Sequence, residues 1–293
     1  MKIISVPRII GAILLIAGII SNFTIKSGAL FLAVIGIILL IAPTKHAQEM
    51  LKLCLQTLKQ WKTTAKTFIY DLLFWALAGG AMYLFFKWVT LKATKLQATA
   101  MITKESILNP DLVAQNAGAI KGFLIYSITG AIISLLVCLL LYTISREMIW
   151  TTIAKTKPTK KFFLKFLLLN LIWWAILAVL YILIVSATGK TLYGKITVII
   201  LLIAGAYITV IMQALFTKKQ QIGHSLGNSI AFSITKIHKL IVPIVYAVII
   251  FAILSQPLRL INNANALAPS AVLMLVWYAW LRMYLYEIIK KFE

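Results

Sequence analysis

Acidic, histidine and cysteine side chains, which carry most catalysis and metal binding in proteins, are few and scattered in this chain of 293 residues. His224 and His238 would stand almost four turns apart on one helix, and neither Cys54 nor Cys138 lies near a second ligand. The seven acids, no two of which have metal-ligand spacing, are Glu49, Asp71, Glu105, Asp111, Glu147, Glu287 and Glu293. We therefore expect no catalytic residue, no metal site, no cofactor and no enzymatic activity.

Two polar residues inside apolar segments are the candidates for a function within a membrane. Asp71 and Asn170 each lie a few residues after the start of such a segment. An ionisable residue within a membrane span indicates either a functional site or a buried pair. Because Asp71 is about one turn from the start of its segment, it can reach water, or pair with Lys66 or with a lysine of the preceding helix. A structural pair and a residue lining a transport path both stay open.

The composition places the chain in a membrane. Hydrophobic residues make up 62% of the chain, charged residues 12%, and the mean hydropathy is +0.97, whereas soluble domains are about 45–50% apolar. The net charge of +22 comes from 29 basic and 7 acidic residues. Only four of the basic residues are arginine, and the lysines lie mostly between apolar segments, so we expect no nucleic-acid partner.

Eight apolar segments, most of them long enough to cross a bilayer as helices, fill most of the chain. They cover residues 9–23, 27–43, 68–86, 122–145, 166–187, 196–216, 240–254 and 270–288. They predict an all-α transmembrane helical bundle of about eight spans. The first two segments are short and form a hairpin within residues 1–43, and whether they cross the bilayer or re-enter it stays open.

The basic residues between the segments predict the orientation. With the N-terminus inside, the cytoplasmic segments hold 20 of the Lys and Arg residues and the outer segments hold 9. Because positive charge accumulates on the cytoplasmic side, we expect a multi-pass protein of the cell membrane with both termini in the cytoplasm. Outside, residues 90–121 form one sizeable segment, in which we expect a turn at Asn109-Pro110 between two short helical pieces.

Residues 44–67 have the pattern of a basic amphipathic cytoplasmic helix. Apolar residues recur at steps of three and four, while Lys45, Lys52, Lys59 and Lys66 recur every seven residues on another side. Such a helix either lies on the membrane with its lysines toward anionic headgroups or caps the bundle as ordinary tertiary structure. The two roles do not exclude each other. Contact with anionic lipid or with a protein partner is expected here and at the basic run with Lys157, Lys160 and Lys161.

A second amphipathic segment covers residues 220–239. Its apolar stripe consists of Ile222, Leu226, Ile230, Ile234 and Ile237. Gly223, Gly227 and Ala231 form a small-residue face beside this stripe, and we expect another helix to pack closely against it.

Residues 68–293, the predicted six-span bundle, contain signs of a parallel internal repeat. Lys66, Asp71, Trp75 and Ala76 match Lys165, Asn170, Trp174 and Ala175 at a constant offset of 99 residues. Each copy continues into a return span with a Gly-Ala pair, at residues 130–131 and 205–206. Because both copies start from a basic cytoplasmic stretch, they run in the same direction.

The chain resembles a known group through a motif of three parts. These are Trp-Ala in an outward span, Gly-Ala in the return span, and Gln-x-x-Gly-His-Ser-Leu-Gly-Asn-Ser at residues 220–229. The group consists of prokaryotic, largely archaeal, polytopic membrane proteins of unknown function. They are similar in turn to the membrane region of glycerophosphodiester phosphodiesterase fusions. The resemblance covers roughly residues 59–254 and implies a helical bundle without known catalytic residues, so the hydrolase activity is not transferred.

Two functions follow as expectations. The first is a non-enzymatic membrane scaffold or assembly component that contacts anionic lipid or a partner protein through its cytoplasmic face. The alternative is a transporter or channel for a small solute or lipid. A continuous polar cavity that reaches mid-membrane would favour transport, while a dry bundle with Trp75 and Trp174 in its core would favour a scaffold.

Overall fold

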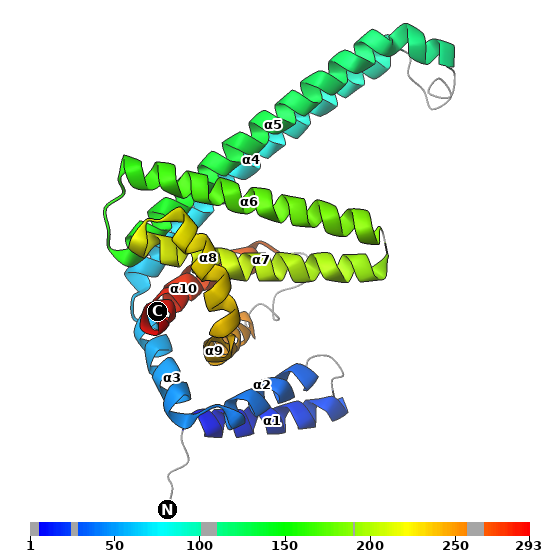
Figure 1. Cartoon of the computed structure of the whole chain (residues 1–293). Helices are drawn as coiled ribbons and strands as arrows, with labels where there is room; N and C mark the ends of the chain where they lie inside the picture. Colours follow the sequence, from blue (N-terminus) through cyan, green and yellow to red (C-terminus); the bar gives the residue numbers. More distant parts are fainter. Residues whose placement is uncertain (1–5, 25–28, 101–109, 190, 257–266) are drawn as a thin grey trace, which may run out of the picture. The chain divides into compact units, whose positions relative to one another are not determined.

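The computed structural model of the chain describes residues 6–24, 29–100, 110–189, 191–256 and 267–293. In these ranges all regular secondary structure is helical, which confirms the all-α fold (Figure 1). The helices are α1 (Val6–Thr24), α2 (Ala29–Ile41), α3 (Thr44–Leu58), α4 (Trp61–Ala100), α5 (Pro110–Ala154), α6 (Lys160–Thr188), α7 (Leu192–Lys219), α8 (Ile222–Thr235), α9 (Ile237–Ser255) and α10 (Leu267–Phe292). The eight apolar segments form α1, α2, α4, α5, α6, α7, α9 and α10, and the amphipathic segments give rise to α3 and α8.

The helices belong to two compact units. Unit 1 contains Met1–Phe68 and Ile149–Glu293, and unit 2 contains Ile69–Met148. Helices α4 and α5 each pass from one unit into the other, so unit 2 is a single long helical hairpin. This division differs from the one predicted from the sequence, with domains at residues 1–43, 44–67 and 68–293. The two units follow packing between helices, whereas the predicted domains follow changes of composition along the chain.

Six helices of the described residues, α4, α5, α6, α7, α9 and α10, are long and apolar enough to cross a membrane. The N-terminal pair is different. Helix α2 has 13 residues, which rise about 20 Å, less than the roughly 30 Å of a hydrocarbon core. The eight expected spans therefore correspond to six long helices and one N-terminal hairpin with a short second helix.

Glycines let α1 and α2 approach each other closely. A Cβ atom added to Gly36 would lie 2.6 Å from the backbone nitrogen of Leu15 and 2.7 Å from the carbonyl oxygen of Gly11. A Cβ atom on Gly11 would lie 3.0 Å from Leu39 and from the carbonyl oxygen of Gly36. Backbone stands directly against backbone here, as in the small-residue contacts of membrane helices.

The expected helix over residues 44–67 is divided in two. Helix α3 ends at Leu58 and α4 begins at Trp61, with Lys59 and Gln60 between them. The carbonyl oxygen of Gln60 accepts hydrogen bonds from the backbone nitrogens of Thr63 and Thr64, which starts α4. No glycine or proline marks this α3–α4 break, so neither of the usual breakers announces it in the sequence.

Helices α4 and α5 are longer than a bilayer requires. Helices α4 and α5 contain 40 and 45 residues, which rise about 60 and 68 Å. The expectation of two short helical pieces in residues 90–121 is wrong for the described part, because α4 continues to Ala100 and α5 starts at Pro110. Residues 87–100 contain no glycine or proline, so nothing in their composition stops the helix. Asn109 lies outside the described residues.

Candidate functional site

The ends of four helices of unit 1 meet at one place. Lys218, at the end of α7, forms an ion pair of 2.8 Å with Glu293, directly after α10. His46 of α3 bonds through Nε2 to the carbonyl oxygen of Lys239, in the first turn of α9, at 3.2 Å. The ammonium of Lys239 in turn lies 5.1 Å from the ring centre of Phe292. Lysine-rich segments that the charge pattern predicts to share one side of the membrane thus lie together, and we call this place the basic end.

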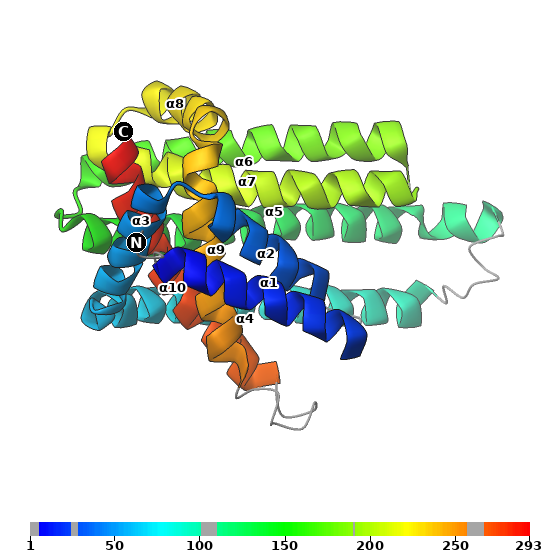
Figure 2. The ribbon, with the colours of Figure 1, turned by 90° about the horizontal axis from the view of Figure 1, so that it is seen from below.

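Helix α6 also starts at the basic end. Lys165 Nζ donates a hydrogen bond of 3.2 Å to the carbonyl oxygen of Gln220, which follows α7. Gln220 has a φ of +52°, a left-handed conformation that ends α7 and turns the chain into α8. Both views show α6 and α7 running side by side up to this turn (Figures 1 and 2).

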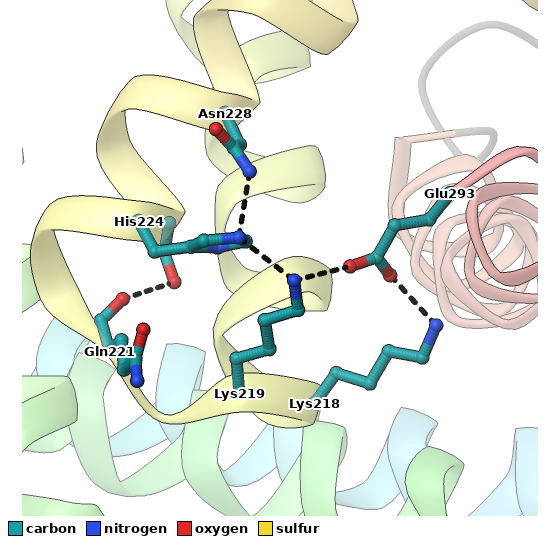
Figure 3. A network of polar contacts seen from close by, with 7 residues as sticks. Lys218, Lys219, Gln221, His224, Asn228 and Glu293 are labelled. Atoms are coloured by element: carbon teal, nitrogen blue, oxygen red, sulfur yellow. Dashed lines mark hydrogen bonds and ion pairs between the residues drawn. The ribbon is translucent and has the colours of Figure 1, made fainter.

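A polar network joins the turn after α7 to α8 (Figure 3). His224 Nε2 lies 2.9 Å from Lys219 Nζ and 2.8 Å from Asn228 Nδ2. Glu293 extends the network, with 2.8 Å to Lys218 and 3.9 Å to Lys219. These groups are largely exposed, so the network orients side chains more than it stabilises the fold.

The lysines singled out from the sequence are exposed. They are Lys45, Lys52, Lys59, Lys66, Lys157, Lys160 and Lys161. The seven-residue spacing puts the first two on α3 and the third just after it, but Lys66 belongs to α4, beyond the α3–α4 break. Thr159 caps α6 by accepting a hydrogen bond from the backbone of Phe162, which fixes the basic run where the span begins.

The apolar face of α3 is covered by protein. Ala47, Met50, Cys54 and Thr57, spaced by three and four residues, are buried. Aromatic side chains of α9 and α10 bond to this face, as the hydroxyl of Tyr246 donates to the carbonyl of Ala47 at 3.1 Å, that of Tyr284 to the carbonyl of Met50 at 3.0 Å, and Trp280 Nε1 to Thr57 Oγ1 at 3.2 Å. Helix α3 therefore caps the bundle with this side, while Leu55 and Leu58 of the same helix are 53% and 41% exposed.

Titratable groups of α3 reflect the same packing. Burial raises the pKa of the Cys54 thiol to about 11. Desolvation lowers the pKa of His46, although its bond to the Lys239 carbonyl partly counteracts this. The hydrogen bond from Lys291 and the charge of that lysine lower the pKa of Glu49. The start of α9 and the end of α10 thus reach the titratable groups of α3.

Helix α8 buries a side that lies beside its apolar stripe and includes Phe232. Ser225, Ser229 and Ser233 are buried, and each hydroxyl bonds to a carbonyl of its own helix. In contrast, Ile230 and Ile234 are 43% and 71% exposed. Small, internally satisfied serines let α8 pack on its neighbours, while the isoleucines face outward, where lipid can cover them.

The small-residue face of α8 is open as well. A Cβ atom added to Gly223 or Gly227 would meet no atom within 4 Å, and Ala231 is exposed. The expected close packing of another helix against this face is therefore wrong for the described part of the chain. The spacing of the glycines predicts a helix face without large side chains, but it does not predict whether another helix packs on that face.

In unit 2, Asp71 is buried in an ion pair. Its Oδ1 atom lies 2.8 Å from Nη1 of Arg146, and both side chains are almost completely buried. The guanidinium carbon of Arg146 lies 5.7 Å and 5.1 Å from the ring centres of Phe74 and Tyr142. Ser145 of the same helix donates a hydrogen bond to a carbonyl of α4. Asp71 thus has a structural partner on α5.

In unit 1, Asn170 belongs to a buried chain of amide bonds. Its Nδ2 atom donates to the carbonyl of Phe166, and its Oδ1 atom accepts from Gln213 Nε2, both at 2.8 Å. The Oε1 atom of Gln213 accepts from Trp150 Nε1, again at 2.8 Å. The chain links the end of α5 to α6 and α7. Each of these side-chain amide contacts pairs a donor with an acceptor, so the burial of the network is compensated.

The partners of Asp71 and Asn170 could have been found by depth. Gln213 lies as close to the end of its apolar segment as Asn170 lies to the start of its own, and Arg146 directly follows the segment that returns from Asp71. Antiparallel neighbours bring residues of equal depth together.

The tryptophans are distributed differently from the scaffold expectation. Trp75 and Trp174, the matched pair of the repeat, are 58% and 48% exposed, so they do not form a core. Trp150, Trp173 and Trp280 are buried instead. In a membrane protein, exposed aromatic rings face lipid, and the sequence pattern of the repeat therefore reports an outer surface.

In the described part of the chain, no group of three or more His, Cys, Asp and Glu side chains could hold a metal ion. No protein-family model, curated protein or solved structure matches the chain. The resemblance to prokaryotic polytopic membrane proteins stays a prediction. Six long apolar helices support an integral membrane protein.

Proposed function

We propose that the protein is a non-enzymatic membrane scaffold or assembly component whose basic end contacts anionic lipid headgroups or a partner protein. One observation carries this proposal. Exposed lysines lie at or near helix ends, and ion pairs and hydrogen bonds join these helix ends to one another. A lysine close to an anionic surface contributes roughly 1 kcal/mol. Several such lysines on a fixed surface would hold anionic headgroups firmly at physiological salt.

The polar residues of the spans support a structural role over transport. Asp71 is engaged by Arg146, and Asn170 by Gln213. A cavity of about 280 Å³ in unit 1 and a hollow of about 350 Å³ in unit 2 are lined by neither Asp71 nor Asn170.

We place the basic end in the cytoplasm, with both termini on that side. The support is the excess of Lys and Arg in the segments that converge there. The cytoplasmic leaflet carries the anionic lipids that such a surface attracts. Orientation and function are therefore parts of one proposal.

The test is lipid retention. The full chain is purified in mild detergent from vesicles of phosphatidylglycerol and phosphatidylcholine, and bound lipid is quantified by mass spectrometry. In the variant, glutamine replaces Lys45, Lys52, Lys157, Lys160 and Lys161. We expect this variant to lose most of the preference for phosphatidylglycerol.

The control compares Lys157, Lys160 and Lys161 replaced by glutamine with Lys87, Lys92 and Lys95 of unit 2 replaced by glutamine, and only the second set should keep the preference. Equal retention by the wild-type chain and the five-lysine variant contradicts the lipid contact. Solute flux in proteoliposomes that disappears with Asn170→Ala contradicts the scaffold itself and establishes transport.

A further inference from the structure

We propose that a groove beneath the α3–α4 break binds one acyl chain of an anionic phospholipid, with the lipid phosphate held by Lys59 and Lys62. The proposal rests on the proposed function, since it identifies one specific lipid position at a surface that attracts anionic lipid. The groove belongs entirely to unit 1. Its walls come from the start of α4 and from α9 and α10.

The groove has the size and lining of a site for a slender apolar ligand. Its volume is about 280 Å³, near the lower limit of roughly 300–1,000 Å³ for small-molecule sites. The main walls are Trp61, Phe68, Ile250, Leu254, Trp277 and Trp280. Among the described residues, none that lines the groove is charged. An acyl chain satisfies this lining, whereas a polar solute would lose its hydration without compensation.

The polar edges of the wall residues are occupied inside the protein. Trp277 Nε1 donates to the carbonyl of Ala247 at 2.9 Å, and Trp280 Nε1 donates to Thr57 Oγ1 at 3.2 Å. The ring of Trp277 also lies against Phe251, with 4.9 Å between the ring centres. These bonds fix the indole rings. Because both indole nitrogens are engaged inside the protein, the rings present only apolar surface to the groove.

Two exposed lysines are chain neighbours of residues that line the groove. Lys59 directly follows Leu58, and Lys62 directly follows Trp61, both of which line the groove. The Nζ atom of Lys62 lies 5.9 Å from the ring centre of Trp61, and Trp61 is 65% exposed. Tryptophan and lysine at the start of a span are typical of the level of lipid headgroups. A phosphate at this level reaches the lysines while its chain fills the groove.

The experiment counts lipids bound to the full chain in detergent by native mass spectrometry. Phosphatidylglycerol and phosphatidylcholine with identical chains are added in equal amounts, and glycerophosphoglycerol, which lacks chains, is added separately. We expect one retained phosphatidylglycerol, less phosphatidylcholine, and no retained chain-free headgroup. Retention of the headgroup alone would overturn the proposal in favour of a phosphate site, and equal retention of both lipids would overturn the assignment of the phosphate to lysines.

Two variants separate the headgroup contact from the groove. Lys59→Gln with Lys62→Gln should lower the preference for phosphatidylglycerol about fivefold per lysine. Ala65→Phe fills the groove and should abolish retention of either lipid. Thermal unfolding checks that Ala65→Phe is folded, and if it is not, Val276→Phe replaces it. Retention that is unchanged in the lysine variant and in a folded groove variant overturns the proposal.

The matched control, Lys157→Gln with Lys160→Gln, removes the same charge elsewhere at the basic end. It should keep the single retained lipid, although it weakens overall enrichment of anionic lipid. If the control loses the lipid as strongly as Lys59→Gln with Lys62→Gln, the groove is not the specific site. Failure of the groove variants with normal enrichment leaves the proposed function intact, so the two failures are distinguishable.

Discussion

The two helices of hairpin α4/α5 are joined near one end by the ion pair of Asp71 and Arg146. The two helices of hairpin α6/α7 are joined by a hydrogen bond between the neutral amides of Asn170 and Gln213. Asp71 and Asn170 are separated by the repeat offset of 99 residues, and each bonds across to the return helix. The first copy surrounds its guanidinium with aromatic rings. The second extends its amides to the indole of Trp150. Matching positions of the predicted repeat thus carry a charged pair in one hairpin and an amide pair in the other.

The two hairpins differ in register as well as in charge. Gly130 faces the ring of Phe85, and Gly205 faces Leu177, so a glycine of each return helix receives a large side chain of the outward helix. Phe85 lies 14 residues after Asp71, whereas Leu177 lies 7 residues after Asn170. The Gly-Ala pairs of the proposed repeat therefore do not occupy equivalent depths. The match of the outward helices is better supported than that of the return helices.

The largest effect should come from breaking the charged pair on one side. Arg146→Leu leaves the Asp71 carboxylate buried without its partner, which costs about 3–5 kcal/mol. Unfolding of the purified chain by sodium dodecyl sulfate in mixed micelles measures the change. The double variant Asp71→Leu with Arg146→Leu is the control, because two apolar residues should restore stability to the wild-type level or above. A double variant as unstable as the single one would show that the pair itself is required.

A smaller loss should follow in the neutral hairpin. Asn170→Leu leaves the Nε2 donor of Gln213 without its acceptor, which costs about 1–3 kcal/mol. The same unfolding titration measures it. If Asn170→Leu costs as much as Arg146→Leu, charge is not what distinguishes the two hairpins.

Converting one hairpin to the chemistry of the other should cost less still. Asp71→Asn with Arg146→Gln replaces the ion pair by two amides, as in α6/α7, and avoids the desolvation of two charges. We expect stability within about 1.5 kcal/mol of the wild type, since a volume change in a packed site is the remaining penalty. Asp71→Asn alone is the control, and it should be less stable than the double variant.

The smallest effects should come from the glycines of the return helices. Gly205→Ala gains about 0.5–1 kcal/mol of helix propensity, and its Cβ atom would lie 3.1 Å from a methyl group of Leu177, which can rotate away. Gly130→Ala meets the rigid ring of Phe85 at 3.0 Å, so its gain should be smaller or absent. Thermal unfolding of both variants gives the comparison. Greater stabilisation by Gly130→Ala would mean that Phe85 moves more freely than Leu177.

The sequence predicted the fold to the level of its helices, because apolar length and lysine position are direct consequences of the bilayer. It did not predict which surfaces pack on protein. For α3, aromatic hydroxyl and indole groups of distant helices decide that the apolar face is covered. For α8, the buried side contains three serines and Phe232, whereas Ile230 and Ile234 are exposed. Hydrophobic periodicity cannot distinguish lipid from protein as the neighbour.

The polar residues were predicted as positions but not as pairs. Lys66 was one of the partners that we considered for Asp71, yet Arg146 takes this place. Pairing depends on which helices are adjacent, and adjacency arises from packing of the whole hairpin. The α3–α4 break was missed for a similar reason, because Lys59 and Gln60 are residues that a helix tolerates well.

The position of the charged pair along hairpin α4/α5 leaves most of the hairpin on one side of it. Asp71 lies near the start of α4 and Arg146 near the end of α5. From Asp71 to Ala100, α4 rises about 44 Å, whereas a hydrocarbon core is roughly 30 Å thick. A hairpin that crosses such a core from the level of the pair therefore carries about two further turns of α4 beyond the opposite membrane surface.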